Sequence, residues 1–88
     1  MTTFMVEITQ ADVVRAFEDE ASGMFGLWPN VSPLAQAVMR LVGREKWVEI
    51  YTSSARIDRH MYGHDAKDVL HSYSADVVGH KVNFWRMW

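Results

Sequence analysis

The segment DRHMYGHD carries the densest group of side chains that could do chemistry. It contains two carboxylates, Asp58 and Asp65, and two histidines, His60 and His64, that lie four positions apart. Histidines at this spacing share one face of a helix, where both can bind one metal ion. Gly63 lies between them and disfavours a continuous helix, and in an extended strand the two side chains would be about 13 Å apart. We therefore expect no metal site and interpret the segment as a polar turn, with Asp65 as a helix cap.

An acid–base pair is the second chemistry that this segment could support. If residues 55–61 form a strand, Asp58 and His60 share one face of it, and the carboxylate could orient the imidazole. The histidine could then take a proton from an RNA hydroxyl while Arg56 and Arg59 hold phosphate, as in small ribonuclease toxins. No serine of the chain lies in a nucleophile-elbow or serine–lysine motif. RNA cleavage or nucleic-acid binding is therefore the alternative function.

The composition excludes several kinds of site and leaves no cofactor to expect. The chain has no cysteine, which excludes a disulfide framework, a thiolate zinc site and a cysteine nucleophile. Its glycines form no phosphate-binding GxGxxG or GxxxxGKS/T pattern, and its net charge of −2 offers no electrostatic footprint for nucleic acid. No run of about 18 apolar residues could span a membrane. Because the N-terminus also lacks the features of a secretory signal, we expect a cytoplasmic protein.

What remains is a small module that binds another protein and is not an enzyme. Its acidic residues Glu18, Asp19 and Glu20 are consecutive and could face a partner with a basic surface. Small single-domain proteins of this kind are common among phage and mobile-element products that inhibit a host protein complex, including inhibitors of CRISPR complexes. That analogy rests on size and on the lack of a catalytic motif.

Tryptophan is unusually frequent, with four residues in a chain of 88. Tryptophan fills small cores and is also enriched at binding hot spots. We expect Trp47 in the core. The candidate contacts to an apolar partner, or to a second copy in a homodimer formed through the last strand, are Trp85, Met87 and Trp88; Trp28, in an apolar loop, is the remaining candidate.

Two helices are expected in the N-terminal half, after a short strand over residues 4–8. Thr9 is followed three residues later by an acid, which resembles a capping box and predicts a helix over residues 10–22. Ser32 and Pro33 are a cap residue and a favoured first residue, and they predict a second helix over residues 33–42, ended by Gly43. The apolar residues at helical spacing that should form the first helix's buried face are Val13, Val14, Phe17 and Ala21.

The C-terminal half reads mainly as strands. Residues 46–52 are rich in β-branched and aromatic side chains and predict a strand, with residues 55–61 returning as a second one. The rival is a single helix over residues 45–62, which would restore the metal interpretation if it ran through Gly63. Residues 66–76 fit a helix, although they also alternate as a strand would.

A turn at Gly79–His80 leads into the final segment, residues 81–88, which is expected to be a strand. Both faces of that strand carry apolar side chains. One face can meet the core, and the other lies under a helix or is exposed at an edge of the sheet. We therefore expect one α+β domain over residues 1–88, with two N-terminal helices packed on a small antiparallel sheet from the C-terminal half. An all-α fold is the alternative.

Overall fold

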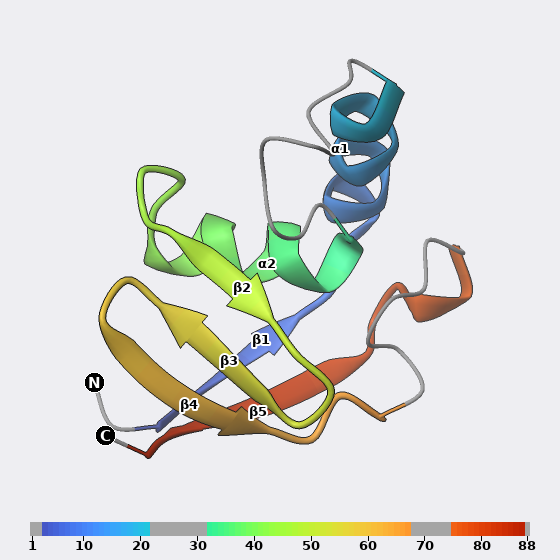
Figure 1. The fold of residues 1–88 in the computed structure, drawn as a ribbon. Helices are drawn as coiled ribbons and strands as arrows, with labels where there is room; N and C mark the ends of the chain where they lie inside the picture. Colours follow the sequence, from blue (N-terminus) through green and yellow to red (C-terminus); the bar gives the residue numbers. More distant parts are fainter. Residues whose placement is uncertain (1–2, 22–31, 68–74, 88) are drawn as a thin grey trace.

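A computed structural model describes residues 3–21, 32–67 and 75–87 of the 88-residue chain, excluding the side chains of residues 20 and 21. These residues form two α-helices, a short 3₁₀-helix and a five-stranded sheet in which all neighbouring strands are antiparallel (Figure 1). The predicted α+β fold is therefore confirmed, and the all-α alternative is wrong. Within the described ranges, neither helix has the length and apolar content that crossing a membrane requires.

The N-terminal elements are the strand β1 (Thr3–Glu7), the helix α1 (Gln10–Ala21) and the helix α2 (Pro33–Val42). Their bounds agree closely with the predicted strand and helices. The start of α2 is capped as predicted, because the Ser32 hydroxyl accepts a hydrogen bond from the Ala35 amide at 3.3 Å.

The buried face of α1 differs from the predicted one. Asp12, Val13 and Ala16 are buried, whereas Val14 and Phe17 are 47% and 54% exposed. The reason is the position of the helix: α1 packs against α2, while α2 lies over the sheet (Figure 1). A helix that meets one other helix buries a narrower stripe than a helix that covers a sheet.

The C-terminal strands are β2 (Val48–Ile50), β3 (Ser54–Ile57), β4 (His60–His64) and β5 (Lys81–Arg86). The strand prediction for residues 46–52 is confirmed, and the rival single helix is wrong. The single return strand over residues 55–61 is also wrong, because the chain turns back and forms two strands there.

The turn between β3 and β4 consists of Asp58 and Arg59. Asp58 has a φ of 54°, and Arg59 is not among the described residues with positive φ. A positive φ at the first central residue alone is the pattern of a type II′ hairpin turn. The usual residue there is glycine, so the sequence carried no strong signal for this turn, and Gly63 lies within a strand instead.

The final part of the chain follows the prediction in outline. The predicted helix over residues 66–76 lies mostly outside the described residues, of which Ala75–Val77 forms the 3₁₀-helix η3. The turn at Gly79–His80 is confirmed, with a φ of 92° at Gly79. β5 follows it, but the sheet order β1-β5-β4-β3-β2 places β5 between two neighbours. The edge position considered for the last strand is therefore wrong, but the face that does not meet the core is exposed, and a homodimer through this strand stays a prediction.

The core lies between α2 and the inner face of the sheet. α2 contacts both edge strands, β1 and β2, so the sheet curves around it (Figure 1). Phe4 stacks on Phe84 with 5.0 Å between ring centroids and meets the edge of the Tyr62 ring at 5.4 Å. The largest buried side chains of the core include Ile8, Leu34, Val38, Val48, Val82 and Phe84.

Candidate functional site

Asp58 and His60, the predicted acid–base pair, have separate partners. The Asp58 carboxylate accepts a hydrogen bond from the Trp47 amide at 2.9 Å and forms an ion pair with Lys46 at 3.3 Å. The Trp47 amide and the Lys46 ammonium hold the pKa of Asp58 below its ordinary value. The His60 Nδ1 instead accepts from the Arg86 guanidinium at 2.7 Å. The type II′ turn breaks the strand alternation that would have placed both side chains on one face.

The structure also does not bring Arg56 and Arg59, the predicted phosphate-binding residues, together with His60. The Arg56 Nε donates to the Asp58 carbonyl oxygen at 2.8 Å, and its Nη1 lies 4.0 Å from Glu49 Oε1. Arg59 is exposed at the hairpin turn. The arginines therefore do not converge with His60 on one described hollow. RNA cleavage stays a prediction without support from this arrangement.

His64 is a buried structural residue. Its Nδ1 accepts a hydrogen bond from the Ala66 amide at 3.2 Å, so the ring proton must lie on Nε2. Nε2 faces the carbonyl oxygens of Tyr51 at 2.8 Å and Ser54 at 3.1 Å. Because both ring nitrogens are engaged, neither has a lone pair for a metal ion. In the described part of the chain no group of three or more histidine, cysteine or acidic side chains can hold a metal ion.

Asp65 does not cap a helix in the described structure. Its two carboxylate oxygens accept from the backbone amide of Asn83 at 2.8 Å and from the Asn83 side-chain amide at 3.0 Å. These bonds lower the pKa of Asp65. The polar residues of DRHMYGHD therefore fasten β4 and the following segment to their neighbours, and they form no common site.

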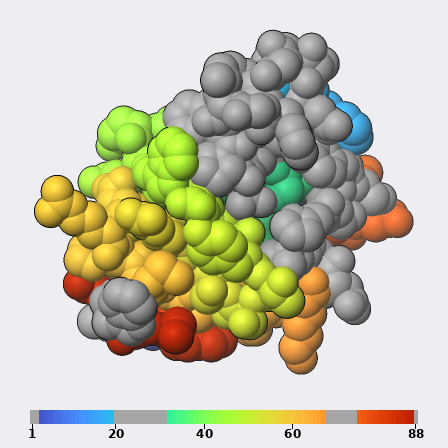
Figure 2. Space-filling view, in the orientation of Figure 1, coloured from blue at the N-terminus to red at the C-terminus, as the bar shows by residue number. Residues whose placement is uncertain are grey.

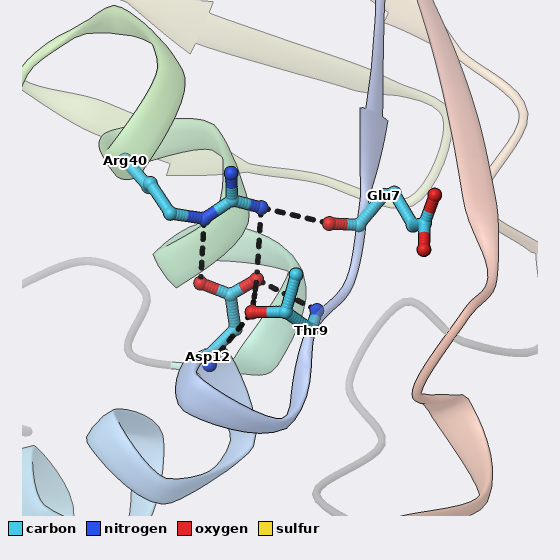
Figure 3. Close-up of polar contacts among 4 residues, drawn as sticks. All are labelled: Glu7, Thr9, Asp12 and Arg40. Carbon is cyan, nitrogen blue, oxygen red and sulfur yellow. Dashed lines mark hydrogen bonds and ion pairs between the residues drawn. The ribbon is translucent and has the colours of Figure 1, made fainter.

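An ion pair between Arg40 and the buried Asp12 joins α1 and α2, and Arg40 also reaches the end of β1 (Figure 3). Asp12 and Thr9 form the predicted capping box, with the Thr9 amide donating to Asp12 Oδ2 at 2.9 Å and the Asp12 amide donating to Thr9 Oγ1 at 3.3 Å. Arg40 donates to both oxygens of Asp12, at 3.2 and 3.1 Å, and to the Glu7 carbonyl oxygen at 2.8 Å. The hydrogen bond to Asp12 is the main cause of the raised pKa of Arg40. The sequence predicted the box, but not the arginine that reaches it from α2.

The acidic group on α1 is divided between the helix interface and the solvent. Glu18 is exposed. Asp19 turns toward α2, where it accepts from the Gln36 side-chain amide at 2.8 Å and forms an ion pair with Arg44 at 3.5 Å. Three of the predicted contact residues lie outside the described side chains: Glu20, Trp28 and Trp88.

The outer face of the sheet exposes several apolar side chains. We name this surface the open face and define it by Met5, Met61, Gly63, Trp85 and Met87. The strand registers place these residues on the side of the sheet opposite to the core, and neither described helix packs over them. Met5, Trp85 and Met87 are 51%, 42% and 53% exposed. In Figure 2 the yellow-green and yellow residues of the neighbouring strands β2 and β3 reach the surface.

Trp85 lies at the centre of the open face. It is the cross-strand neighbour of Gly63, and a Cβ atom added to Gly63 would collide with the Trp85 indole ring. The indole therefore lies over the glycine backbone. Beside it is a shallow hollow of about 350 Å³, whose lining includes Thr3, Met5 and Asn83. The alternation of KVNFWRMW predicted Trp85 and Met87 as contacts, whereas Met5 and Met61 were missed.

An aromatic group flanks the open face at β2. Trp47 is 44% exposed, so the prediction that it lies in the core is wrong. Its indole Nε1 and the Tyr51 hydroxyl each donate to the Glu49 carboxylate at 2.5 Å. Tyr51 and then Trp47 lower the pKa of Glu49, and Glu49 raises the pKa of Tyr51. Side chains alternate along β2, so Glu49 lies on the outer face of the sheet between the buried Val48 and Ile50. Trp47 and Tyr51, two positions away on either side, lie on the same face as Glu49.

Together, the fold and the exposed side chains define an α+β domain that has helices on one face of its sheet and a tryptophan–methionine surface on the other. No family model matches the chain, and neither a curated protein nor a solved structure matches it significantly.

Proposed function

We propose that this protein is a non-enzymatic module that binds another protein through its open face. The observation that carries the proposal is the exposure of Trp85 together with Met5 and Met87 on a sheet surface that neither described helix covers. Exposed apolar groups of this kind mark interaction sites, and tryptophan is enriched among the residues that contribute most to binding. Methionine adapts its shape to a partner because its side chain is flexible and polarisable.

The charges beside the open face favour an apolar partner surface. Glu7 is the cross-strand neighbour of Lys81, and Glu49 is the neighbour of Arg56. Each pair combines opposite charges, so neither sign dominates at these positions. The binding energy should then come mainly from the apolar centre, and the polar border should fix the orientation of the partner.

The acidic residues of α1 supply a second part of the proposal. Glu18 is exposed, and we include it as a contact to a basic partner surface on the helix side of the domain; Glu20 is proposed on sequence alone. Asp19 is a weaker candidate because Gln36 and Arg44 already engage its carboxylate. Inhibition of a host protein complex in the cytoplasm is the biological role that fits a small binding module of this kind.

The experiment compares two variants in affinity capture from the native host, with the captured proteins identified by mass spectrometry. Trp85→Ala removes the centre of the open face, and Val14→Ala removes an exposed apolar side chain of α1. We expect Trp85→Ala to weaken capture of the specific partner at least about tenfold, as for a hot-spot residue, while Val14→Ala retains it. Equal capture by wild type and Trp85→Ala would show that the open face is not the binding surface.

The non-enzymatic part of the proposal has its own test. The wild-type protein should not cleave single-stranded RNA, because His60 and Asp58 have separate partners. Cleavage that is present in wild type and absent in His60→Ala would contradict the proposal and would restore the ribonuclease interpretation.

A further inference from the structure

β1 is an edge strand whose second side pairs with no described strand. The hydrogen bonds between β1 and β5 determine which backbone groups of β1 point away from the sheet. The Met87 amide donates to Met61 and the Asp65 amide to Asn83, so the odd-numbered residues of β5 bond to β4. The even-numbered residues of β5 must then bond to β1, which occupies the backbone groups of Phe4 and Val6. Consequently, the amides and carbonyls of Thr3, Met5 and Glu7 point away from the sheet.

A groove runs beside this edge. It has a volume of about 290 Å³ and lies between β1 and α2, with Met5, Val6 and Glu7 on one side and Ala37, Arg40 and Leu41 on the other. Met5 and Leu41 are 51% and 45% exposed. An unpaired strand next to a helix with an apolar surface is the geometry that accepts an added strand, because backbone bonds and side-chain pockets lie together.

Apart from Glu7 and the Arg40 side chain that bonds its carbonyl oxygen, the edge lacks the features that usually prevent strand addition. The sequence of β1, TFMVE, contains no proline and no lysine. Its register with β5 runs without interruption from Thr3 to Glu7, so no bulge turns the strand away. By contrast, the other edge strand, β2, has only three residues.

We propose that the β1 edge pairs with the β1 edge of a second copy of this chain, in an antiparallel register centred on Met5. In this register Thr3 lies opposite Glu7 of the second copy, and Phe4 lies opposite Val6 of the second copy. Glu7 is the only charged residue of β1, and it meets a threonine rather than another glutamate. Phe4 and Val6 face the cores, so their pairing makes one apolar layer that continues from one copy to the other.

The backbone groups also match in this register. The outward residues Thr3, Met5 and Glu7 meet outward residues of the second copy, which is the arrangement of hydrogen-bonded antiparallel pairs. The Glu7 carbonyl oxygen already accepts from Arg40 at 2.8 Å. A carbonyl oxygen has two lone pairs, so it can also accept from the Thr3 amide of the second copy.

The dimer has one consequence for the surface of the molecule. A two-fold axis through the Met5 pair stands perpendicular to the sheet, so the two five-stranded sheets continue into each other with their open faces on the same side. This pairing does not depend on what the open face binds. The two proposals can therefore fail separately.

The test measures the dimer dissociation constant by sedimentation equilibrium for two variants that place opposite charges at the same position. Thr3→Glu places like charges opposite each other at both ends of the interface, and Thr3→Lys places opposite charges there. We expect wild type to form a dimer, with Thr3→Glu dissociating about tenfold or more readily than Thr3→Lys. Any effect of a long charged side chain on the monomer is common to both variants, so their difference reports on the register.

A third variant tests the backbone pairing. Met5→Pro removes an amide that points outward, which an edge strand tolerates, and it should abolish the dimer while circular dichroism stays unchanged. If Met5→Pro does not fold, the two Thr3 variants decide the question. The proposal is overturned if wild type stays monomeric up to about 1 mM, if the two Thr3 variants dissociate equally, or if a folded Met5→Pro variant still forms the dimer.

Discussion

Gly63 has a role that its sequence context did not indicate. Between two histidines it looked like the residue that separates a metal pair, but it is the only glycine of β4 and lies directly under Trp85. An aromatic ring that covers a glycine in a sheet shields the exposed backbone and gives the ring a fixed position. The glycine therefore supports the position of the proposed contact residue, and the two form one unit.

The substitution Gly63→Ala tests this unit. The added methyl group would collide with the indole ring, so either the ring or the strand must move. We expect a loss of about 1–3 kcal/mol in the free energy of unfolding, together with a shift in tryptophan fluorescence, measured by urea denaturation.

The double variant Gly63→Ala/Trp85→Ala supplies the control. Without the indole there is nothing for the methyl group to strike, so Gly63→Ala should be close to neutral in the Trp85→Ala background. Additive effects of the two substitutions would show that Gly63 is required for another reason.

At the scale of elements, the local signals in the sequence were sufficient for the helices. Ser32, Pro33 and Gly43 act within a few residues of the ends of α2, and the predicted bounds of that helix are correct. The type II′ turn was missed because Asp58 adopts a conformation that is more typical of glycine. The exposed side of α1 was missed because it depends on where α2 lies, which no local pattern records.

The contact of Arg40 with Asp12 is the long-range link among these elements. The Asp12 side chain is 4% exposed, and Arg40 joins it to the end of β1. Arg40→Ala would leave a buried carboxylate with only its Thr9 partners, and we expect a loss of about 1.5–3 kcal/mol in the free energy of unfolding, the range for hydrogen bonds to a charged group. Urea denaturation at neutral pH measures this loss.

Arg44→Ala is the matched control, because the ion pair of Arg44 with Asp19 is longer, at 3.5 Å, and more exposed. An exposed pair of this kind contributes less than about 1 kcal/mol. Equal losses for the two variants would contradict the role of Arg40 as the partner of a buried charge.

At the scale of the whole molecule, the sequence predicted the strands better than their order. β1 and β5 are neighbours although they lie at opposite ends of the chain. That pairing buries β5 inside the sheet and leaves β1 at the edge, which reverses the edge assignment made from the last strand. The alternation of side chains along β5 can be read from neighbouring residues alone, so Trp85 was predicted as a contact residue. The joining of Met5 and Met61 to the same surface depends on strand order and could not be predicted.

Amide hydrogen exchange should report this strand order directly. In the monomer the amides of Phe4 and Val6 bond to β5, whereas those of Met5 and Glu7 point outward. In Thr3→Glu, the variant chosen to remain monomeric, we expect the amides of Phe4 and Val6 to exchange at least about tenfold more slowly than those of Met5 and Glu7.

In wild type, a rise in protein concentration should slow the exchange of the Met5 and Glu7 amides selectively, because the second copy then accepts their hydrogen bonds. The measurement is exchange followed by NMR at two concentrations. Equal protection of all four amides in Thr3→Glu would contradict the ladder, and exchange at Met5 that does not depend on concentration would contradict the pairing of the two edges.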